Sequence, residues 1–128
     1  ELTVGVFEDE KESKSIDVTE IISKNIFFDY QAKYTKNMSL HNIPADIPKN
    51  IYKQCLDNAK MVHDTLGCRG ITRSDFIYDE LNQKVFFLEI NTQPGLTPIS
   101  LVPEQLKYHN INFTSLIDKL LLNSSCQK

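Results

Sequence analysis

The sequence predicts an α+β domain in which an antiparallel β-sheet packs against helices. Residues 2–7 and 15–22 are rich in β-branched and aromatic side chains and flank an acidic, lysine-bearing turn, which is typical of a β-hairpin. Residues 70–78 and 85–91 flank a polar turn at 79–84 and predict a second hairpin. Between the hairpins, apolar side chains recur at spacings of three and four residues, as they do along one face of a helix.

The predicted helix between the hairpins ends near Leu66. Asp46 and Pro48 supply start signals, and Gly67 is the glycine expected just past a helix end. The expected buried face consists of Ile51, Cys55, Ala59, Val62 and Leu66.

A third short strand is expected at residues 26–28, before a polar stretch that runs to Pro44. This stretch has no hydrophobic period, and a long aperiodic loop inside a compact domain is commonly a functional lid. Lys33 and Tyr34 lie near its start and favour the lid interpretation.

Two helices are expected after the second hairpin. Residues 100–108 predict a short one, and Asn112 is expected to cap the last one. The apolar face of the last helix would carry Phe113, Leu116, Ile117, Leu120 and Leu121.

Length and composition fit one soluble globular domain: 128 residues, of which 41% are hydrophobic and 24% charged. The net charge of -3 and the lack of a basic run with interleaved aromatics argue against a nucleic-acid partner. No apolar run reaches the roughly 18 residues of a membrane span, and the first residues do not resemble a signal peptide. We therefore expect no membrane partner and a cytoplasmic location. A strand that begins at residue 1 suggests that the chain is part of a larger protein.

Cysteine and histidine do not predict a metal centre. The three cysteines have no C-x-x-C spacing and are expected to be reduced bystanders: Cys55, Cys68 and Cys126. The three histidines stand alone, without a zinc-binding pattern: His41, His63 and His109.

The strand at residues 85–91 ends in polar side chains. Side chains alternate between the two faces of a strand, so each face can be read from the sequence. The face expected to join the core carries Phe86, Leu88 and Ile90. The other face carries Val85, Phe87, Glu89 and Asn91. The same rule puts Arg73 and Asp75 on one face of the neighbouring strand, across from that polar pair.

Asp75, Glu89 and Asn91 offer only oxygen ligands, which suit Mg²⁺. Magnesium sites commonly combine two or three side chains with nucleotide phosphates, so the trio points to a nucleotide-dependent enzyme. A purely structural role stays open, because acidic side chains on exposed strands are common. Arg73 is suited to stabilise a developing anion, or alternatively to form a salt bridge with Glu89.

Four segments together resemble the D-alanine–D-alanine ligases of the ATP-grasp superfamily, in order and spacing over nearly the whole chain. They are F-D-Y-Q-A-K-Y at 28–34, G-x-x-R-x-D at 70–75, E-x-N-T-x-P-G-L-T at 89–97 and S-L-V-P at 100–103. The resemblance implies that residues 1–128 are the carboxyl-terminal part of an ATP-grasp domain. By the same resemblance, the amino-terminal domain and the first half of the ATP-grasp domain are expected to be absent from this chain.

The resemblance also implies a reaction and its metal ions. ATP phosphorylates the carboxylate of one D-alanine, and the amine of a second D-alanine attacks the acylphosphate. Asp75, Glu89 and Asn91 would bind two Mg²⁺ or Mn²⁺ ions, with Glu89 between them. Arg73 and the backbone N–H of Gly95 would stabilise the oxyanion.

Further residues take roles from the same resemblance. Ser100 and the Leu101 backbone would bind the carboxylate of the second D-alanine. Lys33 and Tyr34 would belong to a mobile loop that closes over the phosphates and the first D-alanine, and this tyrosine-bearing loop favours D-alanyl-D-alanine over D-alanyl-D-lactate. The implied catalytic residues are Arg73, Tyr34, Gly95 and Ser100. The implied substrate-binding residues are the same four and Leu101. The ATP-binding set is Glu1, Lys33, Phe87 and Glu89.

The implied parent enzyme makes the peptidoglycan precursor dipeptide in the cytoplasm, with ATP and D-alanine as substrates. Its missing amino-terminal part would be the partner of this chain, a homodimer is an expected assembly, and the fragment alone is expected to be inactive. Two alternatives stay open. The parent could be another ATP-grasp carboxylate–amine ligase, or the chain could be a non-catalytic nucleotide-binding remnant.

Overall fold

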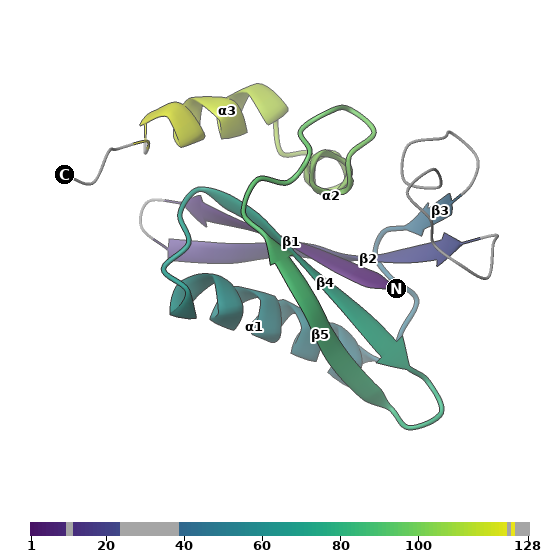
Figure 1. The fold of residues 1–128 in the computed structure, drawn as a ribbon. Coiled ribbons are helices and arrows are strands. Elements are labelled where there is room, and N and C mark those ends of the chain that lie inside the picture. The colour runs from purple at the N-terminus through teal and green to yellow at the C-terminus, as the bar shows by residue number, and fades with distance from the viewer. Residues whose placement is uncertain (10–11, 24–38, 123, 125–128) are drawn as a thin grey trace.

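In the part of the chain that the structure describes, the strands form a five-stranded antiparallel sheet (Figure 1). The structure is a computed structural model, and it describes residues 1–9, 12–23, 39–122 and 124. The order of the strands in the sheet is β3-β2-β1-β4-β5.

Both predicted hairpins are confirmed. β1 (Leu2–Asp9) pairs with β2 (Glu12–Ser23), and β4 (Ile71–Asp79) pairs with β5 (Lys84–Asn91). β1 also pairs with β4, so the two hairpins form one continuous sheet. The first hairpin extends into the segment predicted as a turn, because pairing continues as far as Asp9 opposite Glu12.

β3 (Ser39–Asn42) corrects the prediction of an aperiodic loop that runs to Pro44. It is an edge strand that pairs with β2. Four residues are too few to show a period, so the strand is stabilised by its backbone pairing rather than by a pattern of side chains. The strand predicted at residues 26–28 and most of the predicted lid lie outside the described residues.

α1 (Lys49–Thr65) covers one face of the sheet, and the predicted helix is confirmed. Gly67, at φ +62°, follows its end. The core between α1 and the sheet consists of Leu2, Val4, Val6, Val18, Ala45, Ile51, Cys55, Ala59 and Phe76. The prediction of a buried Leu66 is wrong: it caps the helix end and is 61% exposed. His63 is buried in the last turn instead, 2.8 Å from the hydroxyl of Thr72.

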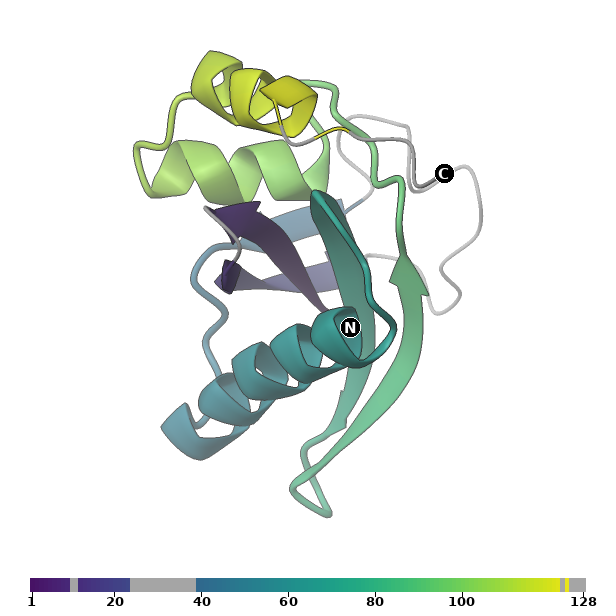
Figure 2. The same cartoon turned by 90° about the vertical axis from the view of Figure 1, so that its left-hand side faces the viewer.

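α2 (Leu101–Tyr108) and α3 (Phe113–Leu122) lie on the opposite side of the sheet from α1 (Figure 2). The core on this side consists of Ile71, Val102, Leu106 and Leu116. Asn112 Oδ1 accepts a hydrogen bond from the N–H of Thr114 at 2.8 Å, which confirms the predicted cap. Of the apolar face predicted for α3, only Leu116 is buried. None of the helices in the described ranges is long and apolar enough to cross a membrane.

The core face predicted for β5 is wrong. Phe86 is 51% exposed and Leu88 is 53% exposed. The β4–β5 register explains the error, because Asp75 pairs with Glu89 and the next residue, Phe76, pairs with Phe87. Leu88 is therefore an extra residue in a β-bulge, and side-chain alternation does not continue through it. β5 also lies at the edge of the sheet, where less of the molecule covers it.

The cysteines of the described residues form no disulfide. Cys55 and Cys68 are free thiols. Burial raises the pKa of the Cys55 thiol to about 11, so this thiol stays protonated at neutral pH. Cys126 lies outside the described residues.

His63 makes the stability of the domain sensitive to acid. Burial lowers its pKa below the ordinary value of 6.5. As the pH falls below 6.5, the His63 side chain of the unfolded chain takes up a proton more readily than that of the folded chain. The free energy of unfolding therefore decreases. We expect the melting temperature of the isolated chain to fall more between about pH 7 and pH 5 than that of His63→Gln, which cannot titrate. Thermal melts followed by circular dichroism test this, and equal decreases in the two proteins would contradict it.

Candidate active site

Strand register brings four predicted site residues to one face of the sheet. Arg73 lies opposite Asn91, and Asp75 lies opposite Glu89, in the β4–β5 pair. Directly opposed residues of an antiparallel pair project to the same face, so the predicted adjacency of the two strands and of these four side chains is confirmed. On its other edge, β4 pairs Arg73 with Gly5, where α2 packs closely on β1. The four residues therefore lie on the α2 side of the sheet.

Arg73 and Asp75 form a two-pronged ion pair. Nε of Arg73 donates to Asp75 Oδ1 at 2.9 Å, and Nη2 donates to Oδ2 at 2.7 Å. The side chain of Asp75 is 5% exposed and that of Arg73 is 17% exposed. The salt bridge with Glu89 considered for Arg73 is not found among the described residues, and Arg73 pairs with Asp75 instead. This geometry holds the guanidinium plane in a fixed direction.

The surroundings of Arg73 are acidic. Burial alone would lower the pKa of Arg73, but the hydrogen bond with Asp75 and the charges of Asp75, Glu89 and Glu1 raise it above its usual value. Three carboxylates around one guanidinium leave the site negative, which favours a bound cation.

The donor set fits a magnesium ion that is shared with other ligands. Within the described ranges, no three His, Cys, Asp or Glu side chains lie close enough to hold a metal by themselves. Mg²⁺ rarely takes a full protein cage and keeps water or phosphate oxygens. Asp75, Glu89 and the amide oxygen of Asn91 could supply part of such a shell. Asp75 would share its oxygens with Arg73, and Asn91 Oδ1 would share its lone pairs with the N–H of Gln93, which it accepts at 2.9 Å.

A tight turn holds three further predicted residues at the start of α2. Ser100 precedes Leu101, the first residue of the helix. The hydroxyl of Ser100 lies 2.8 Å from that of Thr97 and accepts the Thr97 N–H at 3.2 Å. A Cβ atom on Gly95 would lie 2.8 Å from Ser100 Oγ, so a glycine is needed for this approach. The turn thereby fixes the direction of the Ser100 hydroxyl.

Not every predicted residue joins the site. Phe87 pairs with Phe76 across the strands, and their rings meet edge to face at 5.7 Å, on the α1 side of the sheet. Lys33 and Tyr34 lie outside the described residues. Glu1 lies close enough to Arg73 for its charge to raise the arginine pKa.

Sequence reasoning missed Thr3, which supports the ion pair from β1. Thr3 lies opposite Asp75 and is fully buried. Its hydroxyl donates to Asp75 Oδ1 at 2.5 Å. A threonine between the apolar residues Leu2 and Val4 was the available signal, because it marks the strand face that is not part of the apolar core.

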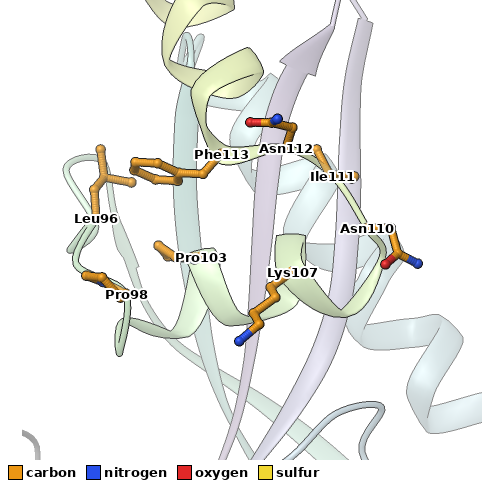
Figure 3. Close-up of a pocket in the computed structure, with 8 residues that line it drawn as sticks. All are labelled: Leu96, Pro98, Pro103, Lys107, Asn110, Ile111, Asn112 and Phe113. Atoms are coloured by element: carbon orange, nitrogen blue, oxygen red, sulfur yellow. The ribbon is translucent and has the colours of Figure 1, made fainter.

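A pocket of about 550 Å³ opens beside the turn, and Figure 3 shows its lining. The side chains of Leu96 and Phe113 point toward one another across it. None of its lining residues belongs to the predicted catalytic, ATP-binding or metal-binding sets. The polar residues on β4 and β5 do not line this pocket. The candidate site is therefore identified by the charged and amide side chains that share one face of the sheet, and not by a cavity.

The family model and the curated relatives that match this chain point to the same family. The family described as "D-ala D-ala ligase C-terminus" matches residues 1–122. The D-alanine–D-alanine ligase of Acidiphilium cryptum is 46% identical over 127 residues, covering 99% of this chain and 40% of that protein. The ligase of Rickettsia typhi is 42% identical and covers 88% of this chain and 35% of that protein. The chain thus spans well under half the length of these curated relatives.

Solved structures show a similar fold. D-alanyl-alanine synthetase A from Vibrio cholerae superposes with a TM-score of 0.80, covering 95% of this chain and 37% of that one, at 24% identity. The VanG D-Ala:D-Ser ligase from Enterococcus faecalis gives a TM-score of 0.75 at 32% identity, covering 94% of this chain and 34% of that one.

The ion pair predicts a specific pattern of stability changes. Arg73→Met leaves the buried Asp75 carboxylate without its cation, and we expect a loss of about 3 kcal/mol, typical of breaking a buried pair. The double variant Arg73→Met/Asp75→Asn removes both charges and should recover at least half of that loss. Urea unfolding of the isolated chain measures both.

Lys53→Met is the matched control. It breaks the exposed pair between Lys53 and Asp57, whose side chains are 74% and 62% exposed. Such a pair contributes less than about 1 kcal/mol. Equal losses for Arg73→Met and Lys53→Met would contradict the buried-pair assignment.

Proposed function

Because this chain belongs to the D-alanine–D-alanine ligase family, whose members it matches at their carboxyl-terminal part, we propose that it forms the carboxyl-terminal part of an ATP-dependent ligase. This ligase would join two D-alanines for peptidoglycan precursor synthesis. The observation that carries the proposal is the set of Arg73, Asp75, Glu89 and Asn91 on one sheet face. The test is to incubate the full-length enzyme with ATP and D-alanine and to measure ADP, phosphate and dipeptide. We place this enzyme in the cytoplasm and propose a homodimer.

We propose that Asp75, Glu89 and Asn91 bind two Mg²⁺ or Mn²⁺ ions together with the phosphates of ATP. The oxygen donors and the negative surroundings of Arg73 support this assignment. When bound, such ions would neutralise charge on the phosphates during phosphoryl transfer.

In the proposed reaction, a carboxylate oxygen of the first D-alanine takes the γ-phosphoryl group of ATP and ADP leaves. The amine nitrogen of the second D-alanine then forms a bond to the acyl carbon, and phosphate leaves. The attacking nitrogen loses one proton to solvent, which gives the neutral amide. Arg73 and the N–H of Gly95 would stabilise the tetrahedral oxyanion between these steps. Asp75 supports this role, because the two-pronged pair keeps the guanidinium charged and oriented.

The start of α2 would hold the carboxylate of the second D-alanine. The first N–H groups of a helix lack partners within the helix and favour an anion. Ser100 adds a hydroxyl that the Thr97 turn already orients. Leu101 would contribute its backbone N–H.

The remaining assignments concern ATP and the closing loop. Lys33 and Tyr34 keep their proposed place over the phosphates and the first D-alanine, and Glu1 and Glu89 keep theirs in ATP binding. Phe87 gains no support as an ATP contact, because its ring packs against Phe76. Phe86 offers a better apolar surface for the adenine ring, since it lies opposite Ile77 on the Asp75 face and is 51% exposed.

A second candidate function is the synthesis of D-alanyl-D-serine. The 32% identity to a D-Ala:D-Ser ligase structure favours including it. Assays of the full-length enzyme with D-alanine, D-serine and D-lactate as acceptors discriminate the candidates. Activity with other amine acceptors alone would indicate a different ATP-grasp carboxylate–amine ligase.

We expect the 128-residue chain by itself to show no ligase activity, because the relatives it matches are more than twice as long. Coexpression with the missing amino-terminal part should restore dipeptide formation, measured by coupled ADP release. The same pair carrying Arg73→Met is the negative control. Turnover by the chain alone would refute this expectation. A full-length protein that makes no dipeptide would favour the non-catalytic remnant, whereas failed restoration beside an active full-length enzyme would show that the separated parts do not assemble.

In the full-length enzyme, we expect Glu89→Gln to reduce kcat by at least a factor of about 100 and Asn91→Ala to reduce it by about tenfold. A bridging carboxylate contributes charge to both ions, whereas an amide contributes one neutral ligand. The measurement is kcat at saturating Mg²⁺. Equal and mild losses would count against the metal assignment.

A further inference from the structure

Gln105 is a fully buried polar residue on α2 that the proposed chemistry does not use. Its side-chain oxygen accepts the N–H of Gly5 at 2.9 Å. Its amide nitrogen donates to the carbonyl oxygen of Thr3 at 3.1 Å and to the hydroxyl of Thr19 at 2.8 Å. Both amide protons and the oxygen are therefore engaged with β1 and β2.

The β1–β2 ladder has a gap where Gln105 binds. Val4 pairs with Val18 and Val6 pairs with Ser15, so the register shifts around Gly5. A buried backbone N–H without an acceptor is costly, and the side chain of Gln105 supplies that acceptor. The strand depends on α2 at this point.

α2 also lies directly on β1 at this position. A Cβ atom on Gly5 would lie 2.8 Å from Gln105 Oε1 and 3.3 Å from a methyl group of Val102. Glycine therefore permits the close approach, and the three hydrogen bonds of Gln105 fix the helix on the strand. Small movements of α2 would break them.

The strand residues that Gln105 holds support the ion pair of the site. Thr3 uses its hydroxyl to bind Asp75, and its carbonyl oxygen binds Gln105. Gly5 lies opposite Arg73. At its other end, α2 begins immediately after Ser100. One buried amide thus connects the helix that follows Ser100 with the strand that supports Arg73 and Asp75.

We propose that Gln105 is a positioning residue that fixes the start of α2, and with it the carboxylate of the acceptor D-alanine, relative to Arg73 and Asp75. The proposal rests on the proposed function. Alignment of the attacking amine depends on this distance, and displacements of about 1 Å reduce rates strongly. Gln105 acts through the backbone and touches no substrate.

The test compares Gln105→Met with Cys55→Ala in the full-length enzyme. Methionine keeps the volume of Gln105 and removes its hydrogen bonds. Cys55→Ala removes a buried side chain on the α1 side of the sheet, away from α2. We expect Gln105→Met to raise the KM for the acceptor D-alanine about tenfold, with the KM for ATP changed less than about twofold. Cys55→Ala should leave both KM values unchanged.

Amide hydrogen exchange provides a readout that does not require activity. In Gln105→Met, amides of residues 96–102 should exchange faster than in the wild type, while those of α1 should not change. Thr19→Val removes only the hydrogen bond between the Gln105 amide and the Thr19 hydroxyl. If Gln105→Met does not fold, this variant should show the same changes to a smaller degree.

An unchanged acceptor KM in an active enzyme would overturn the proposal. Equal changes in Gln105→Met and Cys55→Ala would also overturn it, since they would indicate a general loss of stability. If the wild-type enzyme makes no dipeptide, the proposed function fails. The exchange comparison then decides whether Gln105 positions the start of α2, and unchanged exchange at residues 96–102 would refute it.

Discussion

The pairing of β4 with both of its neighbours is the constraint on which the rest of the structure depends. On one edge it sets Asp75 opposite Thr3, and on the other it sets Asp75 opposite Glu89. A slip of one residue in either register would turn the paired side chains to opposite faces of the sheet. The buried hydrogen bond from Thr3 and the ion pair with Arg73 both need the observed register. The same backbone pairing therefore determines both the order of the strands and which side chains meet in the candidate site.

The two faces of the sheet differ in how they are stabilised. The α1 face is largely apolar and buries residues such as Val4 and Phe76. The α2 face combines a smaller apolar core with buried polar groups, including Thr3 and Gln105, that are hydrogen-bonded to one another. Apolar packing tolerates small shifts, whereas hydrogen bonds require defined distances and angles. The face that requires exact geometry is the one that carries the candidate site.

Local patterns predicted the hairpins and α1, because alternation and helical spacing are properties of neighbouring residues. The same patterns placed Arg73, Asp75, Glu89 and Asn91 together. They failed at Leu88, because a β-bulge depends on the partner strand and reverses the faces that alternation assigns. They also missed β3, which is stabilised by pairing, and Gln105, whose partners are about 100 residues away. The roles of Lys33 and Tyr34 were inferred from an aperiodic stretch and from the motif resemblance, and they remain predictions.

The outer edge of β5 has a practical consequence for the isolated chain. Phe86, Phe87 and Leu88 are consecutive and 51%, 44% and 53% exposed. Within the part of the chain that the structure describes, no strand pairs with this edge. Free backbone donors and acceptors beside exposed apolar side chains form a template for strand addition and aggregation. Expression of residues 1–128 by themselves is therefore expected to favour inclusion bodies, and a solubilising charge would have to be placed on β5.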